Sequence, residues 1–160
     1  MHSGADIVSH PHPAPLTIIV VDDDLDFRLI VRALLRGVAD VAIIVGEAED
    51  GDEALALVRR TRPDILISDV IMPGLNGVDL ARRVRAELPQ TRTILMSSHV
   101  EDAYRLMASD SGADVFINKH VITSSLVPAV RDLISRSTGR GSSGLPNGGA
   151  SSPSSAAPPK

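Results

Sequence analysis

The fold is decided by the stretch DILISDVIMPGLNG, which runs from Asp64 to Gly77. Ile65 to Ser68 form a short apolar run rich in β-branched residues, and such a run predicts a buried parallel strand. Asp69 stands where this strand ends, and the proline, asparagine and two glycines after it are typical of a loop that precedes a helix. The stretch therefore predicts a lone carboxylate at the carboxyl end of a buried strand, where ligands bind in open α/β sheets.

Apolar runs and helical patterns alternate on both sides of this stretch. Strands are predicted over residues 16–21, 41–45, 65–68, 93–97 and 115–118, and helices over 25–37, 53–61, 78–88, 101–110 and from Ser124 or Ser125 onward. Five strand–helix units with short links predict an α/β fold. The expected form is a (βα)5 flavodoxin-like doubly wound parallel sheet with strand order 2-1-3-4-5 and helices on both faces.

Single residues mark the ends of several predicted elements. Asp24 is the expected N-cap of the first helix, and Gly37 is its expected C-terminal stop. Gly112 is expected to adopt a positive φ after the fourth helix, because glycine does so without steric cost. Residues 46–52 are expected to form a polar link between the second strand and the second helix.

The chain of 160 residues is expected to hold one domain with two tails. The domain is predicted over residues 16–136. Residues 1–15, rich in histidine and proline, are expected to be a disordered leader. Residues 137–160 consist mostly of serine, glycine, proline and alanine and are expected to be a disordered tail or linker, because they cannot bury enough apolar surface to offset the entropy of ordering.

The composition excludes several classes of site. The chain has no cysteine, which excludes disulfides, thiolate metal sites and cysteine nucleophiles. Its net charge of -4 argues against direct nucleic-acid binding, since a strongly basic face is the usual signature of that function. No apolar run approaches the ~20 residues of a membrane span, and the leader lacks the apolar core of a secretory signal. We therefore expect a cytoplasmic protein that does not contact a membrane.

Side chains with chemical potential gather at the predicted carboxyl edge of the sheet. Asp22 and Asp23 follow the first strand, Asp69 the third, the pair 97–98 the fourth, and Lys119 the fifth. Clustered carboxylates repel one another unless a cation lies among them, and oxygen ligands without histidine or cysteine favour a hard ion such as Mg²⁺. Mg²⁺, a lysine and a hydroxyl group suit a transferring phosphoryl group, whose acceptor can itself be a carboxylate.

Four motifs, taken together and in order, resemble the receiver domain of two-component response regulators, the CheY-like family. They are VVDDD at 20–24, SDVIMPGLNG at 68–77, MSS at 96–98 and NK at 118–119. The resemblance covers about residues 16–136. It implies a domain that takes a phosphoryl group from a sensor histidine kinase or a phosphotransfer protein in a reaction that requires Mg²⁺.

The resemblance implies roles for the acidic residues. Asp69 is implied to be the phosphoacceptor. Asp23 is implied to bind Mg²⁺ directly, Asp22 directly or through water, and the backbone carbonyl of Ile71 is implied to be a further ligand. The alternative for an aspartate at a strand end is a helix cap or turn residue, and in the acidic run we assign that role to Asp24.

The resemblance also implies a set of switch residues. Ser97 rather than Ser98 is implied to be the hydroxyl that moves to bind the phosphoryl group, Lys119 is implied to pair with that group, and Phe116 is implied to be the aromatic residue that turns inward. The alternative for Phe116 is an ordinary core residue. Ile71 and His99 occupy positions that tune the lifetime of the phosphoryl group in the family.

One residue departs from the family pattern. Receivers commonly carry proline after the lysine, preceded by a cis peptide bond, whereas this chain has His120. A cis bond before a residue other than proline costs about 3 kcal/mol, so the bond between Lys119 and His120 is expected to be trans. The pair Lys119-His120 resembles receivers of the DNA-binding LuxR-type class.

Three functions compete at this point. The first is a phosphorylatable receiver, not an enzyme, that switches a protein-interaction surface formed by 101–110, 115–118 and the last helix. The second is a phosphate-independent, receiver-like interaction module. The third is a haloacid-dehalogenase-like phosphatase, suggested by Asp22 and Asp24 standing two residues apart. A downstream protein target or a missing output domain is expected as a further partner, and a phosphorylation-linked dimer is compatible with the resemblance.

Overall fold

The computed structural model describes residues 13–99, 101 and 109–138. Five parallel strands form one sheet in the order β2-β1-β3-β4-β5, which confirms the predicted topology. The strands are β1 (Leu16–Val21), β2 (Ala42–Ala48), β3 (Ile65–Asp69), β4 (Arg92–Ser97) and β5 (Val115–Asn118). The helices are α1 (Leu25–Leu35), α2 (Gly51–Thr61), α3 (Gly77–Glu87) and α5 (Ile122–Thr138), with short 3-10 helices η1 (Arg36–Val38) and η2 (Lys119–Val121).

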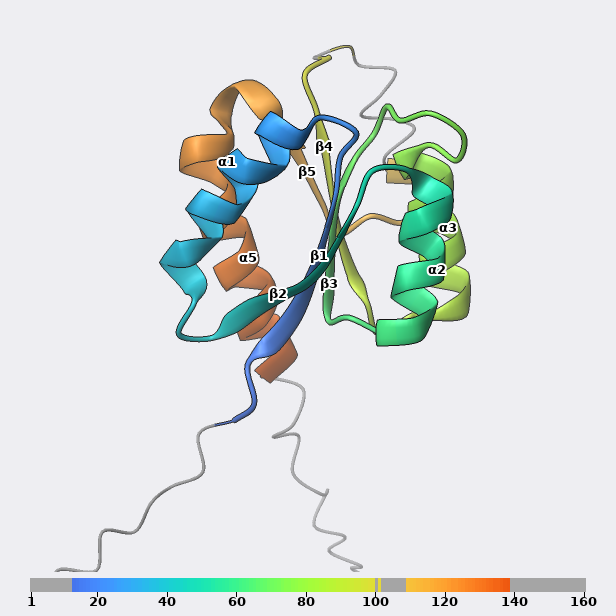
Figure 1. Cartoon of the computed structure of the whole chain (residues 1–160). Helices are drawn as coiled ribbons and strands as arrows, with labels where there is room; N and C mark the ends of the chain where they lie inside the picture. Colours follow the sequence, from blue (N-terminus) through green and yellow to red (C-terminus); the bar gives the residue numbers. More distant parts are fainter. Residues whose placement is uncertain (1–12, 100, 102–108, 139–160) are drawn as a thin grey trace, which may run out of the picture.

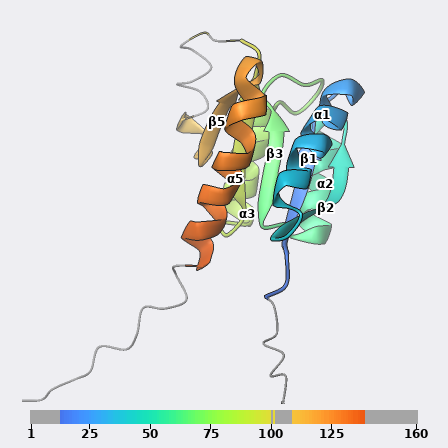
Figure 2. The same ribbon diagram turned by 90° about the vertical axis from the view of Figure 1, so that its left-hand side faces the viewer.

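Helices cover both faces of the sheet (Figure 1). The helices α1 and α5 lie on one face, and α2 and α3 lie on the other. Figure 2, turned by 90°, brings α1 and α5 in front of the strands. No helix in residues 13–99, 101 and 109–138 has the length and apolar character needed to cross a membrane.

The core follows from the alternation of side chains along the strands. In β1, Ile18 and Val20 pack toward α1 and α5, while Ile19 and Val21 pack toward α2 and α3, and all four are 0% exposed. The strand β3 is likewise buried along its whole length. Strands covered on both faces need apolar side chains at nearly every position, which explains the continuous apolar runs in the sequence.

The second strand and second helix are longer than predicted. The strand β2 reaches Ala48 rather than residue 45, because Glu47 and Ala48 pair with Val20 and Val21 after a register shift between Ile18 and Ile19. The expected polar link over 46–52 is therefore wrong for most of its length. The helix α2 begins at Gly51, two residues earlier than predicted, because the Asp50 side chain accepts a hydrogen bond from the amide of Glu53 at 2.8 Å.

The structure confirms the predictions for Asp24 and Gly112 at helix ends but not the prediction for Gly37. Asp24 caps α1 as predicted, since its side chain accepts from the amides of Asp26 and Phe27. Gly112 has the predicted positive φ, at 74°. Gly37 does not end the helical path, because α1 passes at Leu35 into η1.

The last helix begins earlier than predicted. The 3-10 helix η2 leads directly into α5 at Ile122, so Ser124 lies inside the first turn, where its hydroxyl donates to the carbonyl of Val121 at 3.1 Å. The helix continues to Thr138, two residues past the predicted domain end. The leader up to residue 12, the tail from residue 139 and most of the predicted helix 101–110 lie outside the described residues.

Candidate functional site

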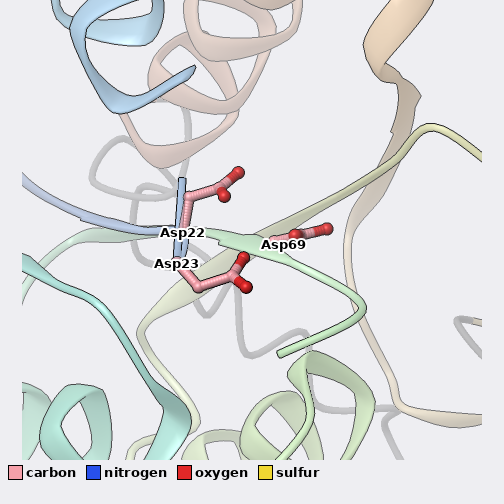
Figure 3. Close-up of side chains that lie close together, drawn as sticks. All are labelled: Asp22, Asp23 and Asp69. Carbon is pink, nitrogen blue, oxygen red and sulfur yellow. The ribbon is translucent and has the colours of Figure 1, made fainter. Parts of the chain in front are cut away.

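Three carboxylates meet at the carboxyl edge of the sheet. Asp22 and Asp23 directly follow β1, and Asp69 ends β3, its neighbour in the sheet, where Val21 pairs with Ser68. One carboxylate oxygen from each of the three aspartates lies within 4.8 Å of the others, and Figure 3 shows the three side chains grouped at the ends of these strands. Asp22 and Asp69 are buried, whereas Asp23 is exposed. The fold thus brings together the three acidic residues that the sequence singles out.

Lys119 inserts a positive charge between two of these carboxylates. It follows β5, and its Nζ lies 2.6 Å from Asp22 Oδ2 and 3.2 Å from Asp69 Oδ2. Its side chain is only 12% exposed, and that of Asp22 is fully buried. A buried carboxylate requires such a partner, because removal of a charge from water is costly unless it is paired and hydrogen-bonded.

The three carboxylates differ in how far their oxygens are already engaged. In Asp22, Oδ1 accepts from the amide of Asp24 at 2.9 Å and Oδ2 accepts from Lys119. In Asp69, Oδ1 accepts only a long hydrogen bond, 3.4 Å, from the amide of Ile71. Asp23 faces solvent. Asp23 and Asp69 are therefore better placed than Asp22 to offer an oxygen directly to a cation.

The environment of Asp69 disfavours its charged form. Burial raises the pKa of the Asp69 carboxyl above its ordinary value of 3.8; the Lys119 ammonium opposes this rise, and the charge of Asp22 adds to it. A cation bound among the three carboxylates would act in the same direction as Lys119 and favour the ionised form. The donor set, which contains only oxygen atoms, fits a hard divalent cation such as Mg²⁺.

Ser97 lies at the end of β4, beside β3, the strand that carries Asp69. Asp69 pairs in register with Met96, so Ser97 stands one residue beyond the level of Asp69. Its side chain is buried, and its hydroxyl accepts from the amide of His99 at 3.1 Å. Ser98 is exposed. This difference in burial favours Ser97 over Ser98 as a hydroxyl that serves the site.

The remaining predicted residues, Phe116, Ile71 and His99, are all at least partly exposed. Phe116, on β5, is half-buried and packs against a small apolar cluster that includes Val70 and Leu95. Ile71 follows Asp69 by two residues and is 42% exposed, and His99 is exposed as well. The two positions assigned to lifetime tuning are therefore both open to solvent.

The connection after Lys119 has its own local structure. The bond between Lys119 and His120 is trans, as predicted from the absence of proline. The side chain of Asn118 accepts from the amide of His120 at 2.9 Å and so caps η2. A short helical turn therefore carries Lys119 at its start and leads without a break into α5.

Two residues of α1 contribute to the site without having been predicted. The Phe27 ring lies under the Lys119 ammonium, with 4.1 Å between Nζ and the ring centroid. The buried Arg28 donates from Nη1 to the carbonyl of Asp22 at 2.6 Å and reaches Glu49 with Nη2 at 3.4 Å. Nothing in the local sequence pattern of α1 distinguishes these two residues from its other apolar and basic residues.

Comparison with known proteins gives a consistent result. The chain matches the response regulator receiver domain over residues 18–131. The "Probable transcriptional regulatory protein NarL" of Mycobacterium tuberculosis is 41% identical over 128 residues, which are 78% of this chain and 57% of that protein. The response regulator protein VraR of Staphylococcus aureus is 30% identical over 116 residues, 72% of this chain and 55% of that protein. The chain thus spans little more than half the length of these curated relatives.

Solved structures show the same likeness. The signal receiver domain of NarL from Mycobacterium tuberculosis has a TM-score of 0.69 at 37% identity, with 75% of this chain and 96% of that domain covered. A LuxR-family two-component response regulator from Aurantimonas has a TM-score of 0.71 at 29% identity, with 77% and 87% covered. The sequence match, the strand order and the neighbouring structures agree, and the chain belongs to the response regulator receiver domain family of two-component systems.

Proposed function

We propose that this chain accepts a phosphoryl group on Asp69 from a sensor histidine kinase or a phosphotransfer protein, in a reaction that requires Mg²⁺. The observation that carries the proposal is the cluster of Asp22, Asp23 and Asp69, with carboxylate oxygens within 4.8 Å, and Lys119 between two of them. An Asp69 oxygen attacks phosphorus, the phosphorus–nitrogen bond of the donor phosphohistidine breaks, and the released imidazole takes up a proton. The product on this chain is an acyl phosphate.

The metal would be held by oxygen atoms at the edge of the sheet. Asp23 and Asp69 would bind it directly, together with the backbone carbonyl of Ile71. Asp22 would act through water, because each of its oxygens already accepts a hydrogen bond from Asp24 or Lys119. When bound, Mg²⁺ supplies positive charge to the oxygens of the transferring phosphoryl group.

Lys119 and Ser97 supply the remaining stabilisation. Lys119 already contacts the Asp69 carboxylate at 3.2 Å, so its ammonium is in place to pair with the oxygens of a phosphoryl group on that residue. Ser97 can exchange its hydrogen bond with the His99 amide for one donated to the same oxygens. Charge developed at Asp69 is thereby met by the cation of Lys119, which directly follows β5, and by a hydroxyl from β4.

The output would be a change in the surface around β5 and α5. Movement of the Ser97 hydroxyl makes room for Phe116 to turn inward, which shifts a pre-existing equilibrium between two surfaces. We infer that the recipient is a downstream protein or an output domain, since the NarL and VraR relatives are longer than this chain. The chain itself would neither turn over a separate substrate nor contact DNA.

Intact mass measurement tests the proposal. The parent is incubated with Mg²⁺ and a small phosphodonor such as acetyl phosphate, alongside Asp69→Asn and the control Asp40→Asn, which removes an exposed carboxylate from a surface turn. The parent and the control should each gain one phosphoryl group, and lose that ability with a chelator, while Asp69→Asn gains none. No gain in the parent would favour the phosphate-independent module, and a gain in Asp69→Asn would move the acceptor elsewhere.

A further inference from the structure

The loop that follows Asp69 is fixed at its base. The amide of Val70 donates to the carbonyl of Met96 at 2.8 Å, and the amide of Gly77 donates to the carbonyl of Val70 at 2.9 Å. Between these two points, residues 71–76 form an arch that carries Ile71 near its start and Asn76, the N-cap of α3, at its end. The position of the arch above this base decides where the Ile71 carbonyl lies.

The first residue of α2 touches the far side of this arch. A Cβ atom at Gly51 would lie 1.9 Å from the carbonyl oxygen of Leu75 and 2.8 Å from both its carbonyl carbon and its Cβ. Real Cβ atoms essentially never come closer than 3.0 Å to such neighbours. Only glycine therefore permits α2 and the arch to approach this closely, and any side chain at position 51 must push them apart by about 1 Å or more.

The helix is the more firmly held of the two partners. Ala54, Leu55 and Val58 of α2 are all at least 95% buried in the core, and Asp50 caps the first turn. In the arch, Met72 is buried in the same core cluster, whereas Pro73 and Gly74 are exposed and Leu75 is only partly buried. An enforced separation at Gly51 would therefore be taken up first by the exposed part of the arch, and it would reach Ile71 and Asp69 through Met72.

We propose that Gly51 is a positioning residue for the metal site, which it supports through Leu75 and the arch. This inference rests on the proposed function, because it assigns the arch to Mg²⁺ binding. Mg²⁺ requires near-ideal octahedral geometry with ligands at about 2.0–2.1 Å, so a shift of about 1 Å in one ligand is poorly tolerated. Loss of residues that orient metal ligands commonly weakens affinity about 10–100-fold.

The test compares two glycine substitutions on either side of the turn between β2 and α2. In Gly51→Ala the new methyl group meets backbone, whereas in Gly46→Ala it meets the flexible end of the Leu57 side chain, Cδ2, at 2.9 Å. Amide chemical shifts of residues 69–77 are recorded without Mg²⁺, and the Mg²⁺ dissociation constant is measured by calorimetry. Gly51→Ala should displace these shifts and raise the dissociation constant about tenfold, and Gly46→Ala should do neither.

A second pair of variants keeps the test decisive if Gly51→Ala does not fold. Asp50→Ala removes the side chain that accepts from the amide of Glu53 and loosens the first turn of α2, whereas Asp50→Asn keeps an N-cap while removing the same charge. Asp50→Ala should weaken Mg²⁺ binding severalfold more than Asp50→Asn does. Equal Mg²⁺ affinity in these two variants would overturn the proposal.

The outcomes separate this inference from the proposed function. A folded Gly51→Ala variant with unchanged loop shifts and parental Mg²⁺ affinity overturns the role of Gly51, whether or not Asp69 takes a phosphoryl group. A parent that binds Mg²⁺ but gains no phosphoryl mass overturns the proposed function alone, and the comparison of Gly51 with Gly46 still decides the positioning role. Failure of the parent to bind Mg²⁺ overturns both.

Discussion

The two edges of the sheet use the same residue types for opposite purposes. At the amino edge, Asp64 accepts from the amide and hydroxyl of Thr17, and Asp114 accepts from the amide of Thr93 and from Arg92. These carboxylates join neighbouring strands, and each oxygen that takes part has a donor from the fold itself. At the carboxyl edge three carboxylates face one another, and the described residues place one lysine among them.

The comparison distinguishes a carboxylate that stabilises the fold from one whose charge the fold leaves only partly paired. A structural aspartate is balanced by the chain and stabilises it, as Asp114 is by Arg92 at 2.9 Å. The carboxylates at the carboxyl edge carry more negative charge than Lys119 neutralises, and Asp69 is buried enough for its pKa to rise. An unbalanced site of this kind lowers stability and favours the binding of a cation.

Removal of the cationic side chain should lower the free energy of unfolding more at the carboxyl edge than at the amino edge. Lys119→Met leaves the fully buried Asp22 without its charged partner, so the free energy of unfolding should fall by about 3–5 kcal/mol in chelator. Arg92→Met removes the corresponding partner of Asp114 at the more exposed amino edge and should cost about 1–2 kcal/mol. Urea denaturation measures both. Equal losses would contradict the distinction between the two edges.

A second comparison removes a carboxylate at each edge. Asp69→Asn removes a charge that burial disfavours, so without Mg²⁺ it should stabilise the fold at pH 7. Asp114→Asn removes a carboxylate that accepts from Arg92 and from the Thr93 amide, and should destabilise it by about 2 kcal/mol. Opposite signs in thermal or urea unfolding support the comparison, and a loss of stability in Asp69→Asn contradicts it.

The stability difference between Asp69→Asn and the parent should change with pH in a definite direction. Because the folded pKa of Asp69 lies above the unfolded value, the native state binds more protons than the unfolded state between the two values, and this group's contribution falls as pH rises. The advantage of Asp69→Asn over the parent should therefore be complete above the raised pKa and disappear as pH falls through it toward 3.8. An advantage that does not change with pH would assign the effect to packing rather than charge.

The smallest effect concerns the ring beneath Lys119. Phe27→Leu removes a cation–π contact of 4.1 Å and should cost about 1 kcal/mol of stability. The chain has two lysines, Lys119 and Lys160, so proton NMR can follow the ε-methylene group of Lys119, which the Phe27 ring should shift upfield. Phe116→Leu alters the chain's other phenylalanine and is the matched control. Loss of the upfield shift in both variants would contradict the assigned contact.

The sequence predicts most of the fold and the charged part of the site, for a physical reason. Strands buried on both faces, such as residues 65–68, leave continuous apolar runs, and the polar residue that ends each run must lie at one edge of a parallel sheet. The positions of Asp69 and Lys119 at the carboxyl edge were therefore predicted from the apolar runs that precede them, together with the expected strand order. The end of β2 was missed because Gly46 and Glu47 interrupt its apolar run. This strand is the outermost one on its side of the sheet, so it is covered less completely than β1 or β3.

Other parts of the site depend on contacts that no local pattern encodes. Phe27 fits the apolar stripe of α1, and nothing within its own helix reveals that Lys119 lies over its ring. Arg28 looks like an exposed basic residue of an amphipathic helix, yet it is 6% exposed and bonded to the carbonyl of Asp22. The close approach of Gly51 to Leu75 likewise follows from the packing of the start of α2 against the arch of residues 71–76. Such contacts become visible only once the sheet has been assembled.

The bridge from Lys119 to Asp22 also has a consequence for biosynthesis. Its two ends are 97 residues apart, and Lys119 directly follows β5, the last strand of the sheet to leave the ribosome. Until β5 docks, the acidic residues that follow β1 and end β3 lack Lys119 as a partner. The entropy cost of closing a loop of this length also still opposes folding. A nascent or partly folded chain therefore lacks the complete group of Asp22, Asp23, Asp69 and Lys119. This group forms only when the fold is complete.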